Sequence, residues 1–235
     1  QKRTGLGPFG YCDDKFISSL FNNKPTSFNL LCMLDAGKYT GYFIPDCKSE
    51  ATLINGIRVA SYPYEIKKAI ELIEILHQKS YEVFLQLMAF SEWSEEEFNI
   101  LRAWKNKNVL KAIYFADSFG SFFPPDIKIF INKLKGLGFA NIGFHPHNSL
   151  QMAFANALEA INAGATFIDA TIYGMGRGSG NLPIEVLLSY LNKIGRKKYN
   201  VVPYLDVIER FYVEFFKKYQ WGYSLKSLFG GIKNI

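Results

Sequence analysis

Six short apolar runs alternate with amphipathic helical patterns along these 235 residues, and this alternation limits the fold more than any other feature. The runs begin near residues 28, 56, 82, 109, 140 and 166. Continuous apolar runs of this length are typical of strands that are buried on both faces. Strands that are each followed by a helix predict parallel βαβ units. The sequence therefore predicts an α/β protein built on a parallel sheet.

Polar residues recur where three of these strands should end, and this favours a (β/α)8 TIM barrel over an open doubly wound sheet. Asp117 and Ser118 follow the fourth run, His145 and His147 end the fifth, and a glycine-rich loop follows the sixth. In barrels the carboxyl ends of the strands carry the chemistry. A closed barrel has eight strands, so we expect one or two strands to precede Gln1. We predict a barrel domain over residues 1–200 and a helical extension over 201–235.

The helices predicted between these strands carry recognisable start signals. Asp13 or Asp14 is placed to cap a short helix to about Leu20, and Ser94 precedes three glutamates that suit the positive end of a helix dipole. Prolines begin four further helical ranges. Four helices are predicted over Pro63–Lys79, Pro125–Leu137, Ser149–Ala163 and Pro183–Lys193. Two more are predicted to begin at Ser94 and at Pro203. In the region after Pro203, aromatic residues between 211 and 221 indicate a packing surface.

Charge and composition argue against several classes of partner. The formal charge of +6 is modest for this length, and no basic stripe interleaved with aromatic residues indicates nucleic-acid binding. No apolar run reaches the roughly 18–20 residues that span a bilayer. The three cysteines are odd in number and have no CxxC spacing, which favours free thiols in a reducing cytoplasm. We therefore expect small-molecule partners, with no nucleic acid and no membrane.

His145 and His147 are the leading candidates for metal ligands. Residues i and i+2 of a strand point to the same face, so the two imidazoles should project together. This spacing suits two nitrogen ligands of one divalent cation. The alternative is that they are ordinary polar residues that form hydrogen bonds at a strand end.

The loop Gly174–Asn181 permits several interpretations. Its glycines at 174, 176, 178 and 180 can supply positive φ angles or resemble a dinucleotide fingerprint, but the acidic residue expected about 20 positions later at a strand end is absent. Arg177 either binds an anionic substrate or faces solvent. Asn181 either caps the helix ahead of Pro183 or lies near the metal.

Five segments in the correct order resemble the metal-dependent lyases of the HMG-CoA lyase-like (DRE-TIM) type. They are Ala116–Gly120, Gly143–Asn148, Ala155–Ala157, Ile168–Ala170 and Gly174–Glu185. The resemblance covers roughly residues 28–195, and its closest likeness is to 4-hydroxy-2-oxovalerate aldolase-like proteins.

This resemblance implies a (β/α)8 barrel that makes or breaks a carbon–carbon bond beside a 2-oxo acid, through a pyruvate enolate. It implies a divalent metal (Mn²⁺, Mg²⁺ or Zn²⁺) on His145 and His147, with Asn181 close to it. Ser118 matches a serine that holds the pyruvate carboxylate or enolate. Asp117 beside it is a further candidate catalytic residue, in a supporting role. The alternatives are that Asp117 is a loop or capping residue and that Ser118 belongs to a helix cap or a turn. The substrates would be a 2-oxo acid and an aldehyde, and the protein would be a homodimer or a hetero-oligomer.

The sequence also departs from the family pattern. The family's first-strand aspartate and arginine have no match, and Ser149 stands where an asparagine is frequent. Gly5–Tyr11 resembles the loop after the family's second strand, so we expect the missing residues upstream of Gln1 and poor activity from these 235 residues alone. Two alternatives stay open: an acyl-CoA condensing synthase of the isopropylmalate or citramalate synthase type, and a non-catalytic binding domain.

Overall fold

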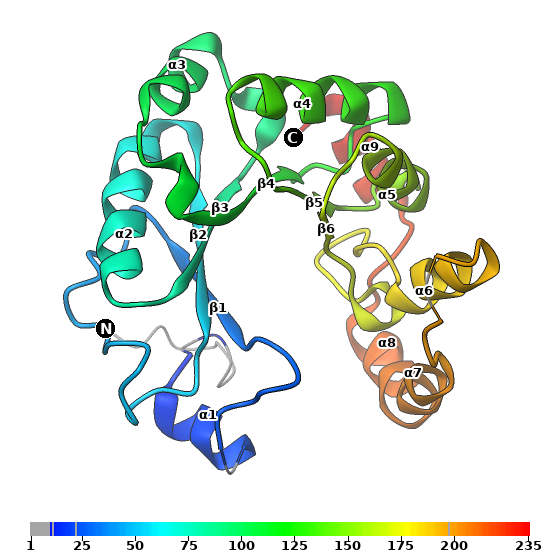
Figure 1. Ribbon diagram of the computed structural model, residues 1–235. Helices are drawn as coiled ribbons and strands as arrows, with labels where there is room; N and C mark the ends of the chain where they lie inside the picture. Colours follow the sequence, from blue (N-terminus) through cyan, green and yellow to red (C-terminus); the bar gives the residue numbers. More distant parts are fainter. Residues whose placement is uncertain (1–9, 11, 22, 197) are drawn as a thin grey trace. The chain divides into compact units, whose positions relative to one another are not determined.

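The strands of the computed structural model lie where the apolar runs predict them. The structure describes residues 10, 12–21, 23–196 and 198–235, so the predicted loop Gly5–Tyr11 lies outside the described residues except for Gly10. The chain divides into two compact units. Figure 1 labels the helices and strands of both. The first comprises residues 1–87 and 94–113, and the second comprises residues 88–93 and 114–235.

The first unit contains three complete strands with their helices. They are α1 (Asp14–Leu20), β1 (Leu31–Asp35), β2 (Gly56–Ser61), η2 (Pro63–Glu65), α2 (Ile66–Gln78), β3 (Glu82–Leu87), α3 (Glu95–Ala103), η4 (Lys107–Val109) and the start of β4 (Leu110–Asp117). The strands pair in parallel, with Leu31 opposite Gly56 and Gly56 opposite Glu82. Asp13 caps α1 by accepting from the backbone N–H groups of Lys15 and Phe16, which confirms one of the two predicted caps.

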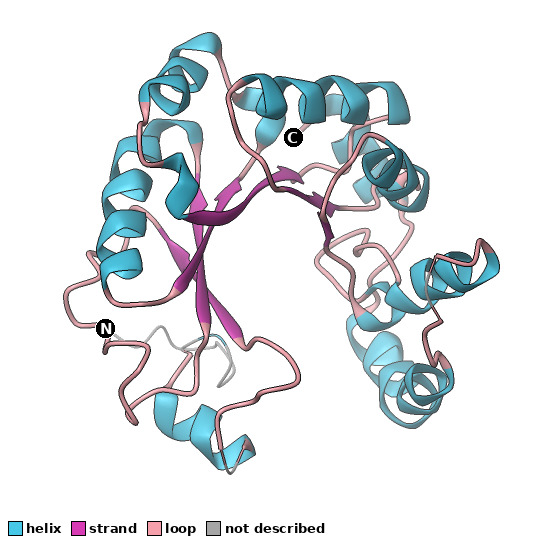
Figure 2. Ribbon diagram, in the orientation of Figure 1, coloured by secondary structure: helices cyan, strands magenta, loops and turns pink. Residues whose placement is uncertain are grey.

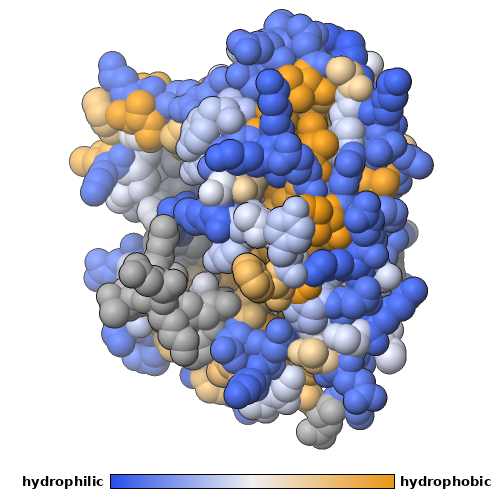
Figure 3. All heavy atoms as spheres, turned by 90° about the vertical axis from the view of Figure 1, so that its left-hand side faces the viewer, coloured by the Kyte–Doolittle hydropathy of each residue, from blue (hydrophilic) through white to orange (hydrophobic). Residues whose placement is uncertain are grey.

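The core of the first unit lies between α2 and strands β2 and β3. Leu72, Ile73 and Leu76 of α2 are buried with Val59 and Leu85 of the strands. The opposite side of α2 carries exposed charged residues, which include Lys67, Lys68 and Glu71. The face shown in Figure 3 is accordingly rich in hydrophilic side chains, with hydrophobic groups scattered between them. This two-sided pattern is the reason that the helix was predictable from its apolar spacing.

The second unit contains the later strands and most of the helices. After the end of β4 come α4 (Pro124–Gly136), β5 (Ile142–Pro146), α5 (Ala153–Asn162), β6 (Phe167–Ile168), η5 (Ile172–Gly174), α6 (Ile184–Lys193), α7 (Val202–Val207), the π-helical turn η6 (Ile208–Tyr212), α8 (Val213–Tyr219) and α9 (Leu225–Lys233), with η3 (Phe90–Glu92) from the earlier segment. Its core includes Phe115 and Phe144, whose rings stack with centroids 4.8 Å apart. Phe90 and Phe130 meet edge to face at 5.0 Å. Aromatic packing of this kind fixes β4 and β5, which end at the candidate site.

The strands occur in the sheet in the order β1-β2-β3-β4-β5-β6, and helices alternate with them along the chain. Figure 2 shows the strands in magenta and the helices in cyan. A doubly wound sheet reverses its strand order at a switch point. Here the strand order is unbroken, and the pairs β1–β2, β2–β3 and β5–β6 are parallel. Both observations confirm the predicted TIM-barrel type of fold. No helix among the described residues is long and apolar enough to cross a bilayer.

The sixth strand is much shorter than predicted. An apolar run over residues 166–172 predicts a full strand, but only Phe167 and Ile168 pair with β5. Beyond them the backbone turns to another partner: Thr171 N–H donates to Leu182 O, and Ile184 N–H donates to Thr171 O. The chain after β6 is therefore held by the segment that follows the glycine loop.

Candidate active site

The predicted site residues all lie in the second unit, at or just after the carboxyl ends of its strands. Asp117 ends β4, His145 lies in β5 and His147 follows it, while Arg177 and Asn181 belong to the glycine-rich loop after β6. This placement follows from the parallel sheet, because all strand ends of one sense lie at one edge.

His145 is held by a carboxylate. Its Nδ1 lies 2.8 Å from Oδ2 of Asp169, which follows β6, and both side chains are half-buried. A carboxylate on one ring nitrogen fixes the orientation of the imidazole and leaves Nε2 as the donor for a ligand. The sequence contained Asp169 within the family-like segment Ile168–Ala170, but its spacing of 24 residues from His145 did not predict this contact.

His147 lies next to His145 and is held neutral. The two ring centroids are 5.1 Å apart, as expected for side chains at i and i+2. Burial lowers the pKa of His147 to about 4, with smaller contributions from His145 and from the positive charge of Arg177. A neutral imidazole is the form that binds metals.

Asn181 lies beside His147 and carries an unsatisfied oxygen. The two residues form an antiparallel bridge, and Asn181 Nδ2 donates to Met175 O at 3.0 Å. Oδ1 of Asn181 is buried and has no hydrogen-bond partner within the described part of the chain. The helix-capping interpretation is wrong, because α6 begins at Ile184 with Pro183 as its N-cap. A buried amide oxygen without a donor fits a cation ligand.

These residues supply some of the ligands that a divalent cation would need. Two imidazoles, one of them oriented by Asp169, and one amide oxygen form a suitable donor set. Among the described residues no cluster of three or more His, Cys, Asp or Glu side chains lies within reach of one metal ion. The anionic ligand that the family resemblance implies therefore has no counterpart in the described residues.

Ser118 and Asp117 shape the turn after β4. The Ser118 hydroxyl accepts a hydrogen bond of 2.8 Å from the backbone N–H of Ala89, which is itself in a left-handed conformation. Its own proton is then the group that it could donate to a ligand. Asp117 is buried and accepts from the backbone N–H groups of Ser121 and Phe122 at 2.8 and 3.2 Å. Burial raises the pKa of Asp117 to about 6, although these N–H groups act in the opposite direction.

A pocket of about 500 Å³ opens beside these residues. From the strand ends it is lined by Ser118, Phe119, His147, Ser149, Arg177 and Ser179. Ser149 and Ser179 are buried, and their hydroxyl oxygens lie 3.0 Å apart. The other wall comes from Gln220, Ser224, Lys226, Ser227, Gly230 and Ile235, which sequence reasoning did not place at the site. No local motif marks these residues, since only tertiary packing brings them to the strand ends.

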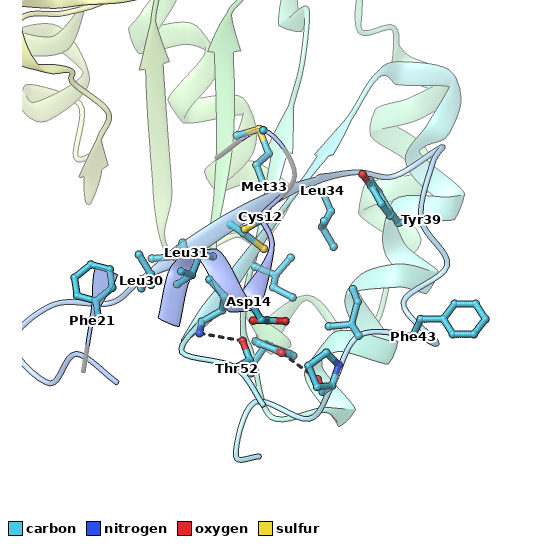
Figure 4. Close-up of a pocket in the computed structure, with 18 of the residues that line it drawn as sticks. Cys12, Asp14, Phe21, Leu30, Leu31, Met33, Leu34, Tyr39, Phe43 and Thr52 are labelled. Carbon is cyan, nitrogen blue, oxygen red and sulfur yellow. Dashed lines mark hydrogen bonds between the residues drawn. The ribbon is translucent and has the colours of Figure 1, made fainter. Parts of the chain in front are cut away.

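A different cavity, of about 610 Å³, lies in the first unit near α1 and β1 (Figure 4). It is mostly apolar, and its lining includes Leu30, Leu31 and Leu34, with Asp14 as the one charged side chain among the described lining residues. Cys12 and Cys32 also line it; the hydrogen bond between these two thiols and burial raise the pKa of Cys32. None of the predicted site residues faces this cavity, so we place the chemistry in the second unit.

Residues 50–208 match the family described as HMGL-like. This range is more than half of the chain, and it includes His145, His147 and Asn181. The chain belongs to the HMGL-like family. The family match ends before the C-terminal wall of the pocket.

Two of the relatives to which the chain is similar carry the names of enzymes. The chain is 35% identical to the oxaloacetate decarboxylase of Mycobacterium tuberculosis over 140 residues, which are 59% of this chain and 41% of that protein. It is 44% identical to the 4-hydroxy-2-oxovalerate aldolase of Carboxydothermus hydrogenoformans over 84 residues, which are 36% of this chain and 25% of that protein. The matches to these relatives thus span less than half of their length.

Solved structures support the same HMGL-like fold. The N-terminal domain of a candidate aldolase from Bacteroides vulgatus superposes with a TM-score of 0.85 at 32% identity, and covers 100% of this chain and 78% of that chain. The carboxyl transferase domain of Rhizobium etli pyruvate carboxylase superposes with a TM-score of 0.65 at 16% identity, over 88% of this chain and 39% of that chain. The second similarity concerns the fold alone.

Proposed function

We propose that this HMGL-like chain is the metal-binding barrel portion of an aldolase-type lyase, which cleaves or forms the carbon–carbon bond next to a 2-oxo acid. The observation that carries the proposal is the pair His145 and His147, with Asp169 hydrogen-bonded to His145 at 2.8 Å. An oriented imidazole, a neutral imidazole and an unsatisfied amide oxygen at the strand ends are a donor set for a divalent cation.

The cation would supply Lewis acidity toward the carboxylate and keto oxygens of a bound 2-oxo acid. His145, His147 and Asn181 would hold it. Ser118 would donate its hydroxyl proton to the substrate carboxylate, because its oxygen already accepts from Ala89 N–H. Asp117 would act as a positioning residue, since its carboxylate holds the backbone of the turn that presents Ser118. Arg177 would add positive charge for an anionic substrate.

The names of the relatives suggest two related substrates. Several relatives are named 4-hydroxy-2-oxovalerate aldolase, and one of them matches 60% of this chain; a relative named oxaloacetate decarboxylase matches 59% of it. Both reactions break a bond at the carbon next to a keto group and leave a pyruvate enolate. We propose aldol cleavage first and oxaloacetate decarboxylation as the second candidate.

The deciding experiment is a pyruvate-release assay with lactate dehydrogenase coupling. The chain, and in parallel the whole product of its gene, would be loaded with Mn²⁺, Mg²⁺ or Zn²⁺ and given 4-hydroxy-2-oxovalerate or oxaloacetate. His145→Ala is the matched inactive variant, and it also corrects for metal-catalysed decay of oxaloacetate. Pyruvate release that depends on metal and on His145 supports the proposal.

The same preparation separates the remaining alternatives. Free thiol from acetyl-CoA and pyruvate would identify a condensing synthase in place of an aldolase. Metal binding by the whole gene product without any turnover would favour a non-catalytic domain. We further propose a reducing, cytoplasmic location, which suits the three unpaired cysteines. We also propose that residues 201–235 form a C-terminal helical extension. The protein would be a homodimer or a hetero-oligomer, and analytical ultracentrifugation would test this oligomeric state.

A further inference from the structure

The C-terminal segment, residues 220–235, is fixed against the loops of the candidate site. Trp221 is buried, and its Nε1 donates to Tyr173 O at 2.9 Å. Gly222 N–H donates to Gly178 O at 2.9 Å. Near the other end, the Ser121 hydroxyl donates to Asn234 Oδ1 at 2.6 Å. These bonds connect the segment both to the turn after β4 and to the glycine-rich loop.

Helix α9 within this segment also packs closely against the side chains of the loop after β5. A Cβ built on Gly231 would lie 2.9 Å from Ser149 Cβ and 3.1 Å from Leu150 Cδ2, so only glycine fits there without a shift. Gly178 similarly faces Ser227, with its virtual Cβ 3.5 Å from Ser227 Oγ. The wall that α9 gives to the pocket is therefore a packed part of the unit.

The side chains that line this pocket are strongly biased in charge. Among the described residues that line it there are two permanent cations, Arg177 of the glycine loop and Lys226 of α9, together with serine hydroxyls, and no side chain with a carboxylate. The carboxylates of Asp117 and Asp169 in the same unit accept hydrogen bonds from backbone N–H groups and from His145. No described lining side chain therefore carries a negative charge that would neutralise the two cations.

From this arrangement we propose that Lys226 is a specificity-determining residue, which binds a second anionic group of the substrate at the end opposite the 2-oxo acid. Arg177 belongs to the glycine-rich loop and Lys226 to α9, and both line the same pocket, so a ligand with two anionic groups can engage both cations. A monoanionic ligand engages only one. The preferred substrate class is then a 2-oxo acid with a further carboxylate or phosphate-like group. This inference rests on the proposed function for the identity of the 2-oxo acid.

The test is a binding titration with metal-free protein, which does not depend on turnover. The chain has three histidines, so the imidazole resonances of His147, assigned with His147→Gln, report on the pocket by NMR. The probes are pyruvate, oxaloacetate and phosphonopyruvate. Lys226→Met removes the charge, Lys226→Arg restores it, and Lys233→Met is a matched control on the same helix but outside the pocket lining.

We expect the wild-type protein to bind at least one dianionic probe about ten-fold more tightly than pyruvate. Lys226→Met should reduce this preference to about two-fold or less, while Lys226→Arg and Lys233→Met retain it. A preference for oxaloacetate alone identifies a carboxylate partner, and one for phosphonopyruvate alone identifies a phosphate-like group. Equal binding of all probes to the wild-type protein, or an unchanged preference in Lys226→Met, overturns the inference.

Failure of the proposed function would look different. If the metal-loaded protein releases no pyruvate from any substrate, but the metal-free protein prefers dianions through Lys226, the proposed lyase function is wrong and the anion-binding role of Lys226 is supported. Metal-dependent pyruvate release with no preference for dianions would support the lyase function and contradict the proposed role of Lys226.

Discussion

Asp169 Oδ2 lies 2.8 Å from Nδ1 of His145, and this contact connects the end of β6 to the end of β5. It sets the tautomer of the imidazole: Nδ1 carries the proton and donates it, and Nε2 is left with its lone pair. A carboxylate in this position also makes the imidazole a better electron donor.

We predict that Asp169→Asn weakens binding of Mn²⁺ or Zn²⁺ by about 10- to 100-fold without unfolding the protein, because the ligand itself remains but its orientation and basicity are reduced. Isothermal titration calorimetry would measure the affinity, and circular dichroism would check the fold. An affinity within a factor of two of the wild type would show that the carboxylate does not support a metal ligand.

His145→Ala should have a larger effect, since it removes one of the two imidazoles outright. We expect stoichiometric binding of Mn²⁺ or Zn²⁺ to be lost in the titration. His77→Ala is the matched control, because His77 is exposed on α2 in the other unit and should leave the isotherm unchanged. Identical isotherms for His145→Ala and the wild type would refute the metal site.

The sequence predicted the elements of this site better than its contacts. The i, i+2 spacing placed His145 and His147 on one face, and the ring centroids do lie 5.1 Å apart. The structure places Asn181 and Arg177 in the loop that borders His147: Asn181 forms a bridge with His147, and the charge of Arg177 acts on its imidazole. Periodicity and local spacing describe neighbours in the chain, so they could not pair Asp169 with His145.

The early end of β6 and the C-terminal residues that line the pocket also depend on tertiary contacts, which local sequence patterns do not predict. An apolar run from Phe167 to Ile172 is compatible with a full strand, and only the competing hydrogen bonds between Thr171 and the segment around Leu182 end the pairing early. The aromatic stripe between residues 211 and 221 predicts a packing surface, which is correct for the buried Trp221, whereas Phe211 is 55% exposed. Aromatic spacing alone does not reveal which side of a terminal helix is covered.

Asp117 should make the stability of the protein depend on pH between about 4 and 6. Its pKa is raised to about 6 by burial, from 3.8 in its ordinary state. The folded protein therefore holds this proton more tightly than the unfolded chain does, and stability falls as pH rises through this window. The difference corresponds to about 3 kcal/mol.

The measurement is the free energy of unfolding in urea at several pH values, for the wild type and for Asp117→Asn. Other titrating groups are common to both proteins, so the difference between the two isolates Asp117. Relative to the wild type, the variant should gain about 2–3 kcal/mol between pH 4 and pH 6.5. A difference that stays constant over this range would contradict a raised pKa at Asp117.

Gly176 is the residue that leaves room for the Asn181 amide. Three glycines of the loop, Gly174, Gly178 and Gly180, have positive φ angles, but Gly176 does not. A Cβ built on Gly176 would lie 2.5 Å from Asn181 Nδ2 and 2.9 Å from its Cγ. We therefore predict that Gly176→Ala displaces the amide, lowers the stability by about 1–3 kcal/mol and weakens metal binding about ten-fold.

Gly136→Ala at the end of α4 is the control, because its Cβ would meet nothing within 4 Å, and it should stabilise the protein slightly. Urea unfolding and metal titration of the two variants provide the comparison; if Gly176→Ala has the same stability and metal affinity as Gly136→Ala, Asn181 is not held in place by this contact.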